Sequence, residues 1–157
     1  MRVGDRHFRS IWVEGDAVRI IDQTRLPHDF AVVTIATLDD AALAIRDMWV
    51  RGAPLIGATA AWGVAVQMAA DPSDASLRET WAVLHETRPT AINLKWALDR
   101  MVAHLAPLPP GARPAAAAAE AQAICDQDVT INHAIGTHGL PLLRDIAARK
   151  GRVNVLT

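Results

Sequence analysis

The sequence has few of the residues on which several common kinds of site depend. It has one cysteine, too few for a disulfide framework or a cysteine zinc site, and a reducing cytoplasm is the expected location. Its basic residues are scattered and its net charge is −1, so no broad basic face for nucleic acid is expected. Residues 1–9 are charged and have no apolar centre, so no signal peptide is expected.

One apolar run, residues 53–70, raises the question of a membrane span. Its length of about eighteen residues is at the lower limit for crossing a bilayer. The run contains Thr59 and Gln67 and has no flanking charged anchors. It therefore predicts a helix buried in a soluble domain, and no membrane partner is expected.

The chain has enough apolar material for one folded domain. Apolar residues make up 51% and charged residues 21% of the sequence, which is typical of a globular protein with a core. The pattern predicts a mainly α fold with a small N-terminal antiparallel β-sheet. Residues 1–36 are expected to form this sheet, as a hairpin and a third strand, and residues 37–151 a helical domain of about six helices.

Helix signals give the boundaries of these six helices. Thr37 is a predicted N-cap, as is either Ser73 or Asp74, while Gly136 and Gly139 are expected to separate the last two helices. Residues 152–157 are expected to be the first strand of a truncated second domain, so the chain is expected to be the front part of a longer protein. The helices are predicted over residues 38–50, 53–70, 75–86, 91–105, 115–134 and 140–150.

Two short motifs place an arginine between helices. The first arginine motif is residues 49–57, with Arg51, Gly52 and Ala53; the second is residues 87–90, with Arg88. A helix N-terminus and an arginine fork both suit a phosphate, and glycine lets the backbone approach it. The alternative is that Gly52 is a left-handed C-cap and each arginine bonds the last carbonyl groups of the preceding helix. Taken alone, the residues favour this capping interpretation.

Other polar clusters are weaker candidates. His133 and His138 are separated by Gly136, so their spacing fixes no ligand geometry, and no metal site is expected. Asp126 and Asp128 are two residues apart on a helix and face different ways. Cys125 is expected to be a buried, inert thiol.

The two arginine motifs together resemble the signature of the methylthioribose-1-phosphate isomerase family. The resemblance covers nearly the whole chain and rests on residues 45–48, 50–57, 87–94 and 96–97, on Asn132, Ile135, Gly136 and Gly139, and on the strand at 153–157. The same superfamily includes ribose-1,5-bisphosphate isomerases and the regulatory α, β and δ subunits of translation initiation factor 2B. The intact VRGAP and RPT sequences favour the isomerase branch.

The resemblance implies an enzyme that converts 5-methylthioribose 1-phosphate to 5-methylthioribulose 1-phosphate in methionine salvage, without a metal or an organic cofactor. It implies substrate binding by Arg51, Gly52, Ala53 and Arg88, a cytoplasmic homodimer, and a helical N-terminal domain followed by a Rossmann-like domain that is missing here. The family's catalytic cysteine and aspartate are expected after Thr157, so this chain has no catalytic residue and is expected to be inactive alone. The alternatives are a ribose-1,5-bisphosphate isomerase and a regulatory domain that binds a sugar phosphate or nucleotide without turnover.

Overall fold

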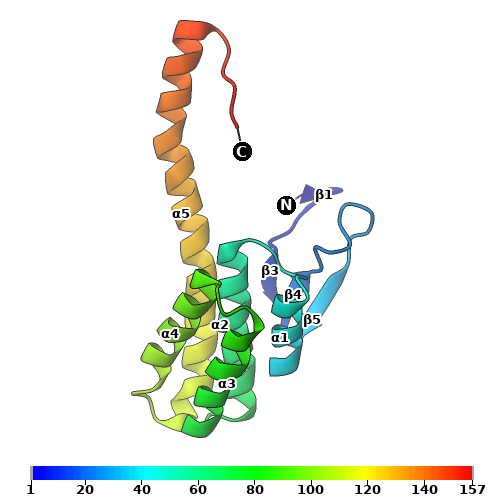
Figure 1. Cartoon of the computed structure of the whole chain (residues 1–157), viewed down its shortest axis with the longest axis vertical. Coiled ribbons are helices and arrows are strands. Elements are labelled where there is room, and N and C mark those ends of the chain that lie inside the picture. Colours follow the sequence, from blue (N-terminus) through cyan, green and yellow to red (C-terminus); the bar gives the residue numbers. More distant parts are fainter. Residues whose placement is uncertain (1, 157) are drawn as a thin grey trace. The chain divides into compact units, whose positions relative to one another are not determined.

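The computed structural model describes residues 2–156 and divides into two compact units, Met1–Ile124 and Cys125–Thr157. The first unit contains all the strands and the first four α-helices. The long helix α5 begins in the first unit and provides the helical part of the second (Figure 1).

The strands form two small antiparallel sheets. The first pairs β1 (Arg2–Val3) with β2 (Arg6–His7), a hairpin that was not predicted from the sequence. The second has the order β3 (Ile11–Glu14), β4 (Ala17–Ile21), β5 (Val32–Ile35). The hairpin and third strand predicted within residues 1–36 are therefore present.

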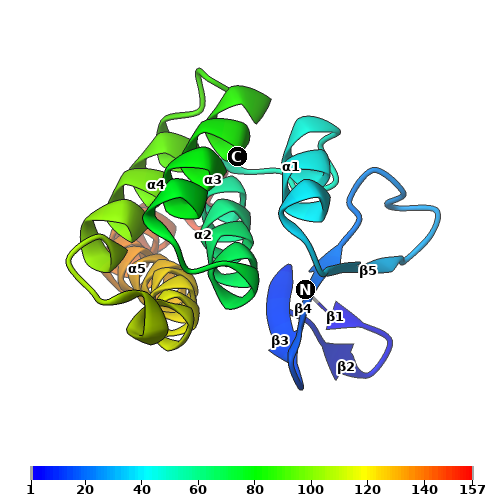
Figure 2. The same ribbon diagram turned by 90° about the horizontal axis from the view of Figure 1, so that it is seen from below.

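The register of the three-stranded sheet aligns its apolar positions. Ile20 on the central strand pairs with Ile11 on one side, and Val18 pairs with Ile35 on the other. All four side chains are buried, because alternate residues of a strand face the same side of a sheet. Figure 2 shows this sheet beside α1, which also contacts α2 and α3.

The residues described contain five α-helices and one short 3-10 helix, where about six helices were predicted. Thr37 and Ser73 are N-caps, as predicted: Thr37 forms a capping box with Asp40, and Ser73 accepts a hydrogen bond from the N–H of Ser76. The helices are α1 (Leu38–Arg46), α2 (Ala53–Ala70), α3 (Asp74–Thr87), α4 (Ile92–Leu105), the 3-10 helix Pro110–Ala112 and α5 (Arg113–Lys150).

The helix count differs because α5 is continuous where two helices were expected. Gly136 and Gly139 lie inside this 38-residue helix, and so does Pro141. A glycine lowers helix stability by about 1 kcal/mol, and an interior proline by about 3 kcal/mol because it removes a hydrogen bond and crowds the preceding turn. Helix α5 nevertheless continues through all three residues. The prediction of a break at the glycines was therefore wrong. Residues 152–156 contain no strand, and Thr157 lies outside the described residues.

Helix α2 is the central helix of the first unit. It contacts α1, α3 and α4, and it also touches β3. By length and composition alone it could cross a membrane, but 61% of it is buried inside the protein. The buried core helix predicted over residues 53–70 is confirmed.

Arg113 joins three segments of the first unit through buried hydrogen bonds. Arg113 is only 2% exposed to solvent. Its Nε donates to the carbonyl groups of Leu105 and Leu108, and its Nη1 donates to that of Pro72 at 2.8 Å. Its Nη2 pairs with the exposed carboxylate of Asp74. The guanidinium therefore links the end of α4, the start of α5 and the loop before α3.

We expect Arg113→Met to lower the free energy of unfolding by about 3 kcal/mol, because it leaves the buried carbonyl of Leu105 and the part-buried carbonyl groups of Leu108 and Pro72 without this donor. Urea unfolding followed by circular dichroism measures this change. Asp74→Asn is the matched control and should cost below about 1 kcal/mol, because Asp74 is mostly solvent-exposed. If the two variants lost equal stability, the exposed ion pair and not the carbonyl network would be the important contact.

Candidate anion-binding site

The first arginine motif is positioned by a main-chain network. Helix α1 ends at Arg46, and Met48 then adopts a left-handed conformation with φ 60°. The N–H groups of Trp49 and Val50 both donate to the carbonyl of Ala44, at 2.9 and 3.4 Å. Val50 is fully buried, so the loop is anchored immediately before the exposed Arg51.

A second main-chain hydrogen bond to this loop comes from the segment that follows β4 of the N-terminal sheet. The N–H of Gln23, two residues beyond β4, donates to the carbonyl of Trp49 at 2.8 Å. No sequence spacing predicts such a bond, because the two residues are far apart in the chain and the contact uses backbone atoms only. The small sheet therefore helps to fix the main chain from which Arg51 projects.

Gly52 does not have the role that the capping interpretation gave it. It is the N-cap of α2, with φ 88° and ψ 133°, and its carbonyl accepts the N–H of Ile56 at 3.1 Å. The end of α1 lies several residues earlier, at Arg46, so Gly52 cannot be its C-cap. This positive φ is one that a non-glycine residue rarely adopts. Ala53 then begins α2, and Pro54 lies in its first turn, where no N–H is needed.

The second arginine motif is a tight turn between α3 and α4. Arg88 is half-buried and directly follows the last residue of α3. Its carbonyl accepts the N–H of Ala91 at 3.0 Å, and this bond closes a turn over Pro89 and Thr90. Helix α4 begins at Ile92, one residue beyond the turn.

The two motifs lie at the same end of the helical unit. Gln67 of α2 bonds Ser76 of α3, so the end of α2 meets the start of α3. Trp81 of α3 bonds Asp99 of α4, which fits the same antiparallel arrangement of α3 and α4 (Figure 2). Helices α2 and α4 therefore run in the same direction, and their N-termini are adjacent.

The first two turns of these helices are in close contact. An added Cβ on Gly57 would lie 2.9 Å from the carbonyl oxygen of Asn93 and 3.4 Å from the Cβ of Ala97. Real Cβ contacts are essentially never shorter than 3.0 Å, so the absence of a side chain at Gly57 permits this approach. It brings the helix that follows Arg51 against the helix that follows Arg88.

The bonding of both arginines is inconsistent with the capping interpretation. Within residues 2–156, neither the Arg51 nor the Arg88 guanidinium has a hydrogen bond or an ion pair. Helices α2 and α4 also lack an N-capping side chain, whereas α1 and α3 have one. Two adjacent helix N-termini thus retain unbonded N–H groups, each preceded by an arginine, and this combination suits an anion such as phosphate.

The other candidates from the sequence do not form a site of this kind. No group of three or more His, Cys, Asp or Glu side chains is close enough to hold a metal ion within residues 2–156. His133 and His138 both lie on the exposed surface of α5. Cys125 is buried, as predicted.

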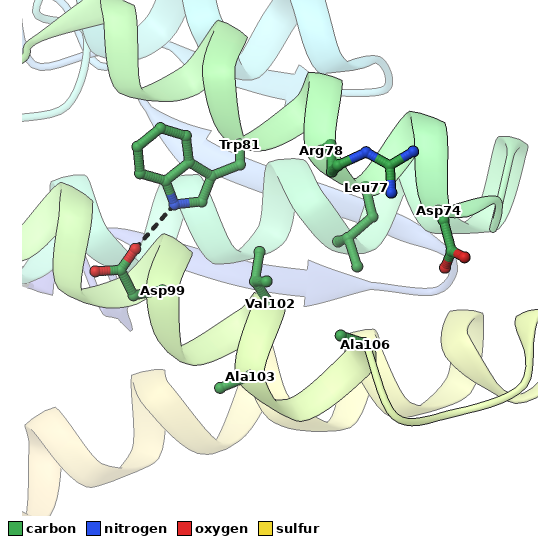
Figure 3. A pocket seen from close by; sticks show the side chains of 8 residues that line it. All are labelled: Asp74, Leu77, Arg78, Trp81, Asp99, Val102, Ala103 and Ala106. Atoms are coloured by element: carbon green, nitrogen blue, oxygen red, sulfur yellow. Dashed lines mark hydrogen bonds between the residues drawn. The ribbon is translucent and has the colours of Figure 1, made fainter.

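A separate groove of about 790 Å³ lies between α3 and α4 (Figure 3). Its lining is largely apolar and includes Leu77, Val102 and Ala106. On its rim, a hydrogen bond from Lys95 and one from the Trp81 indole hold the pKa of Asp99 below its usual value. The groove extends to the start of α3 and the end of α4, the opposite ends from Arg88, so it is not part of the anion-binding site.

Comparison with known proteins gives close relatives. The chain is 67% identical over 158 residues to the methylthioribose-1-phosphate isomerase of Cereibacter sphaeroides, and the alignment covers 100% of this chain and 43% of that protein. It is 52% identical to an uncharacterized protein of Rhodospirillum rubrum, of which it covers 90%. No model of a known protein family matches. The chain thus spans about two fifths of the length of the curated isomerase relatives it matches.

Two solved structures share the fold. The 5-methylthioribose 1-phosphate isomerase of Pyrococcus horikoshii superposes with a TM-score of 0.78 at 33% identity, over 86% of this chain and 40% of that chain. Subunit delta of translation initiation factor eIF-2B from A. fulgidus gives a TM-score of 0.73 at 31% identity, over 78% of this chain and 38% of that one.

We expect Gly57→Ala to lower the free energy of unfolding by about 1–3 kcal/mol, because the added methyl group collides with backbone atoms of α4. Thermal unfolding of the two proteins measures the difference. Gly136→Ala is the matched control: nothing lies within 4 Å of a Cβ there, so it should stabilise α5 by about 0.5–1 kcal/mol. Destabilisation by both variants, or by neither, would contradict the close approach of α2 and α4.

Proposed function

Because the chain belongs to the methylthioribose-1-phosphate isomerase family, we propose that it binds the phosphate group of a sugar 1-phosphate within a larger isomerase. The substrate is 5-methylthioribose 1-phosphate and the product is 5-methylthioribulose 1-phosphate, an aldose-to-ketose conversion in methionine salvage. The complete enzyme is a cytoplasmic homodimer in which a Rossmann-like domain follows this helical one. Alone, the chain is inactive.

One observation carries the proposal for this chain: two unpaired arginines precede two adjacent helix N-termini that have no capping side chain. Each N-terminus contributes oriented N–H groups and a positive partial charge. Arg51 and Arg88 each add a fork of donors, and Gly52 leaves the backbone unobstructed beside Ala53. A phosphate dianion is satisfied by this combination of charge and donors.

The remaining chemistry belongs to groups outside the phosphate site. The isomerisation breaks the bond between C1 and the ring oxygen and moves one hydrogen from C2 to C1. The proton of the C2 hydroxyl leaves as the ketone forms, and the freed ring oxygen gains a proton, so no proton is gained or lost overall. The reaction has no net redox change and needs no co-reactant. It does need acid and base groups within hydrogen-bond reach of the sugar, and we assign these to a cysteine and an aspartate beyond Thr157. The phosphate site fixes the end of the sugar so that C1 and C2 are presented to them.

A second function is supported by the likeness to the initiation-factor subunit. In this alternative the same two arginine motifs bind a sugar phosphate or a nucleotide, and no turnover follows. The two functions share the phosphate site and differ in the groups around the sugar. Incubation of the complete gene product with 5-methylthioribose 1-phosphate separates them, because only the isomerase forms the ketose. A ribose-1,5-bisphosphate isomerase would instead turn over ribose 1,5-bisphosphate.

In the complete gene product, we expect Arg51→Ala and Arg88→Ala each to lower kcat/KM by about 100-fold or more, since each removes a charge-assisted contact to phosphate. Ketose formation and isothermal titration with inorganic phosphate measure the effect. Arg78→Ala is the matched control, because Arg78 is an exposed arginine of α3 that lines the separate groove. Near-normal turnover and phosphate affinity in the Arg51 or Arg88 variant would remove that arginine from the site.

A further inference from the structure

Asn93 lies where the two helices of the phosphate site meet. It is in the first turn of α4, and its own carbonyl oxygen makes the close contact with Gly57 of α2. Its side chain is half-buried. The Cα–Cβ bond of a helical residue tilts toward the helix N-terminus, which for Asn93 is the end of α4 that follows Arg88.

This carboxamide is unpaired in the part of the chain that the structure describes. Within residues 2–156, no hydrogen bond to the Asn93 side chain is present. Two other amide side chains have partners within the chain: Asn132 donates to the carbonyl of Asp128 at 2.9 Å, and Gln67 donates to the hydroxyl of Ser76 at 3.0 Å. The half-buried side chain of Gln23 has none within residues 2–156. A carboxamide has two N–H donors and one acceptor oxygen, and a half-buried one is favoured by a bonding partner.

We propose that Asn93 contacts the substrate directly, through an N–H bond from its carboxamide to an oxygen of the phosphate held by Arg51 and Arg88. This inference rests on the proposed function, and it adds a residue to the phosphate site. The donor is neutral and short, and it is held by the helix that contacts α2. It therefore orients the phosphate between the two N-termini without adding charge, whereas the two arginines supply the attraction.

A purely structural role for Asn93 gives a different expectation. A carboxylate in the first turn of a helix is favoured by the helix dipole, so Asn93→Asp keeps the size of the side chain and should leave the fold as stable or more so. A negative charge facing a phosphate oxygen replaces attraction by repulsion. The aspartate variant therefore separates ligand contact from structural support.

The test uses the complete gene product and isothermal titration with inorganic phosphate, with the melting temperature measured on the same samples. We expect Asn93→Asp to raise the Kd for phosphate by about tenfold or more with an unchanged or higher melting temperature, and Asn93→Ala to raise it less. Asn132→Asp, the same substitution in α5, should leave the Kd unchanged. Wild-type Kd in Asn93→Asp, or a loss of binding that accompanies a fall in melting temperature, would overturn the inference.

The two proposals fail in different ways. If Arg51→Ala and Arg88→Ala weaken phosphate binding while Asn93→Asp does not, the phosphate site stands and Asn93 has no part in it. If the wild-type protein does not bind phosphate, or neither arginine variant changes its affinity, the proposed function fails and the role of Asn93 fails with it.

Discussion

The close approach of α2 to the first turn of α4 is the contact on which the rest of the structure depends. At Gly57 the backbone of α2 meets the backbone of α4 at Asn93, with no side chain between them. Gly63, about two turns further along α2, makes a similar approach to Ala41 of α1 and Leu84 of α3. A helix enclosed on these sides must be apolar all round, and α2 is. Gly57 and Gly63 allow neighbouring helices to pack closely around α2, and the contact at Gly57 also brings the N-termini of α2 and α4 together.

The N-termini of α1 to α4 differ in how their free N–H groups are satisfied. Thr37 and Ser73 cap α1 and α3 with their own side chains, so these two helix ends are complete within the chain. The N-cap residues of α2 and α4 are Gly52 and Ala91, which have no side chain that could cap. An alanine N-cap such as Ala91 is less stable than a capping side chain by about 1 kcal/mol, and a glycine N-cap such as Gly52 by a few tenths of that; an anion bound at these ends would offset the cost. The two ends left open are also the two that lie against each other.

Local signals in the sequence were sufficient to predict helix starts and strands, whose formation depends mainly on neighbouring residues. The side chains of Thr37 and Ser73 predicted two helix starts, and short β-prone runs predicted the three strands of the larger sheet. Gly136 illustrates the limit, because its effect of about 1 kcal/mol is too small to end a helix and the neighbouring residues decide the outcome. The role of Gly52 was mistaken for a similar reason: its positive φ was foreseeable, but whether it closes α1 or opens α2 depends on where α1 ends. The contact between Gly57 and Asn93 depends on the packing of distant segments and has no local signal.

In the function that we propose, the phosphate site and the reacting groups are placed separately, and this separation accounts for how one helical fold can resemble both an isomerase and an initiation-factor subunit. Phosphate binding by helix N-termini and arginines depends on backbone geometry and charge, and it is indifferent to what happens at C1 and C2 of the sugar. A site of this kind can therefore be kept while the groups around the sugar change. In the isomerase that we propose, its contribution to the rate is positional, since a phosphate held by two helices and two arginines leaves the sugar little freedom to turn. The rigidity of the contact at Gly57 then matters for turnover, because any separation of α2 from α4 would loosen the phosphate and move C1 away from the acid and base.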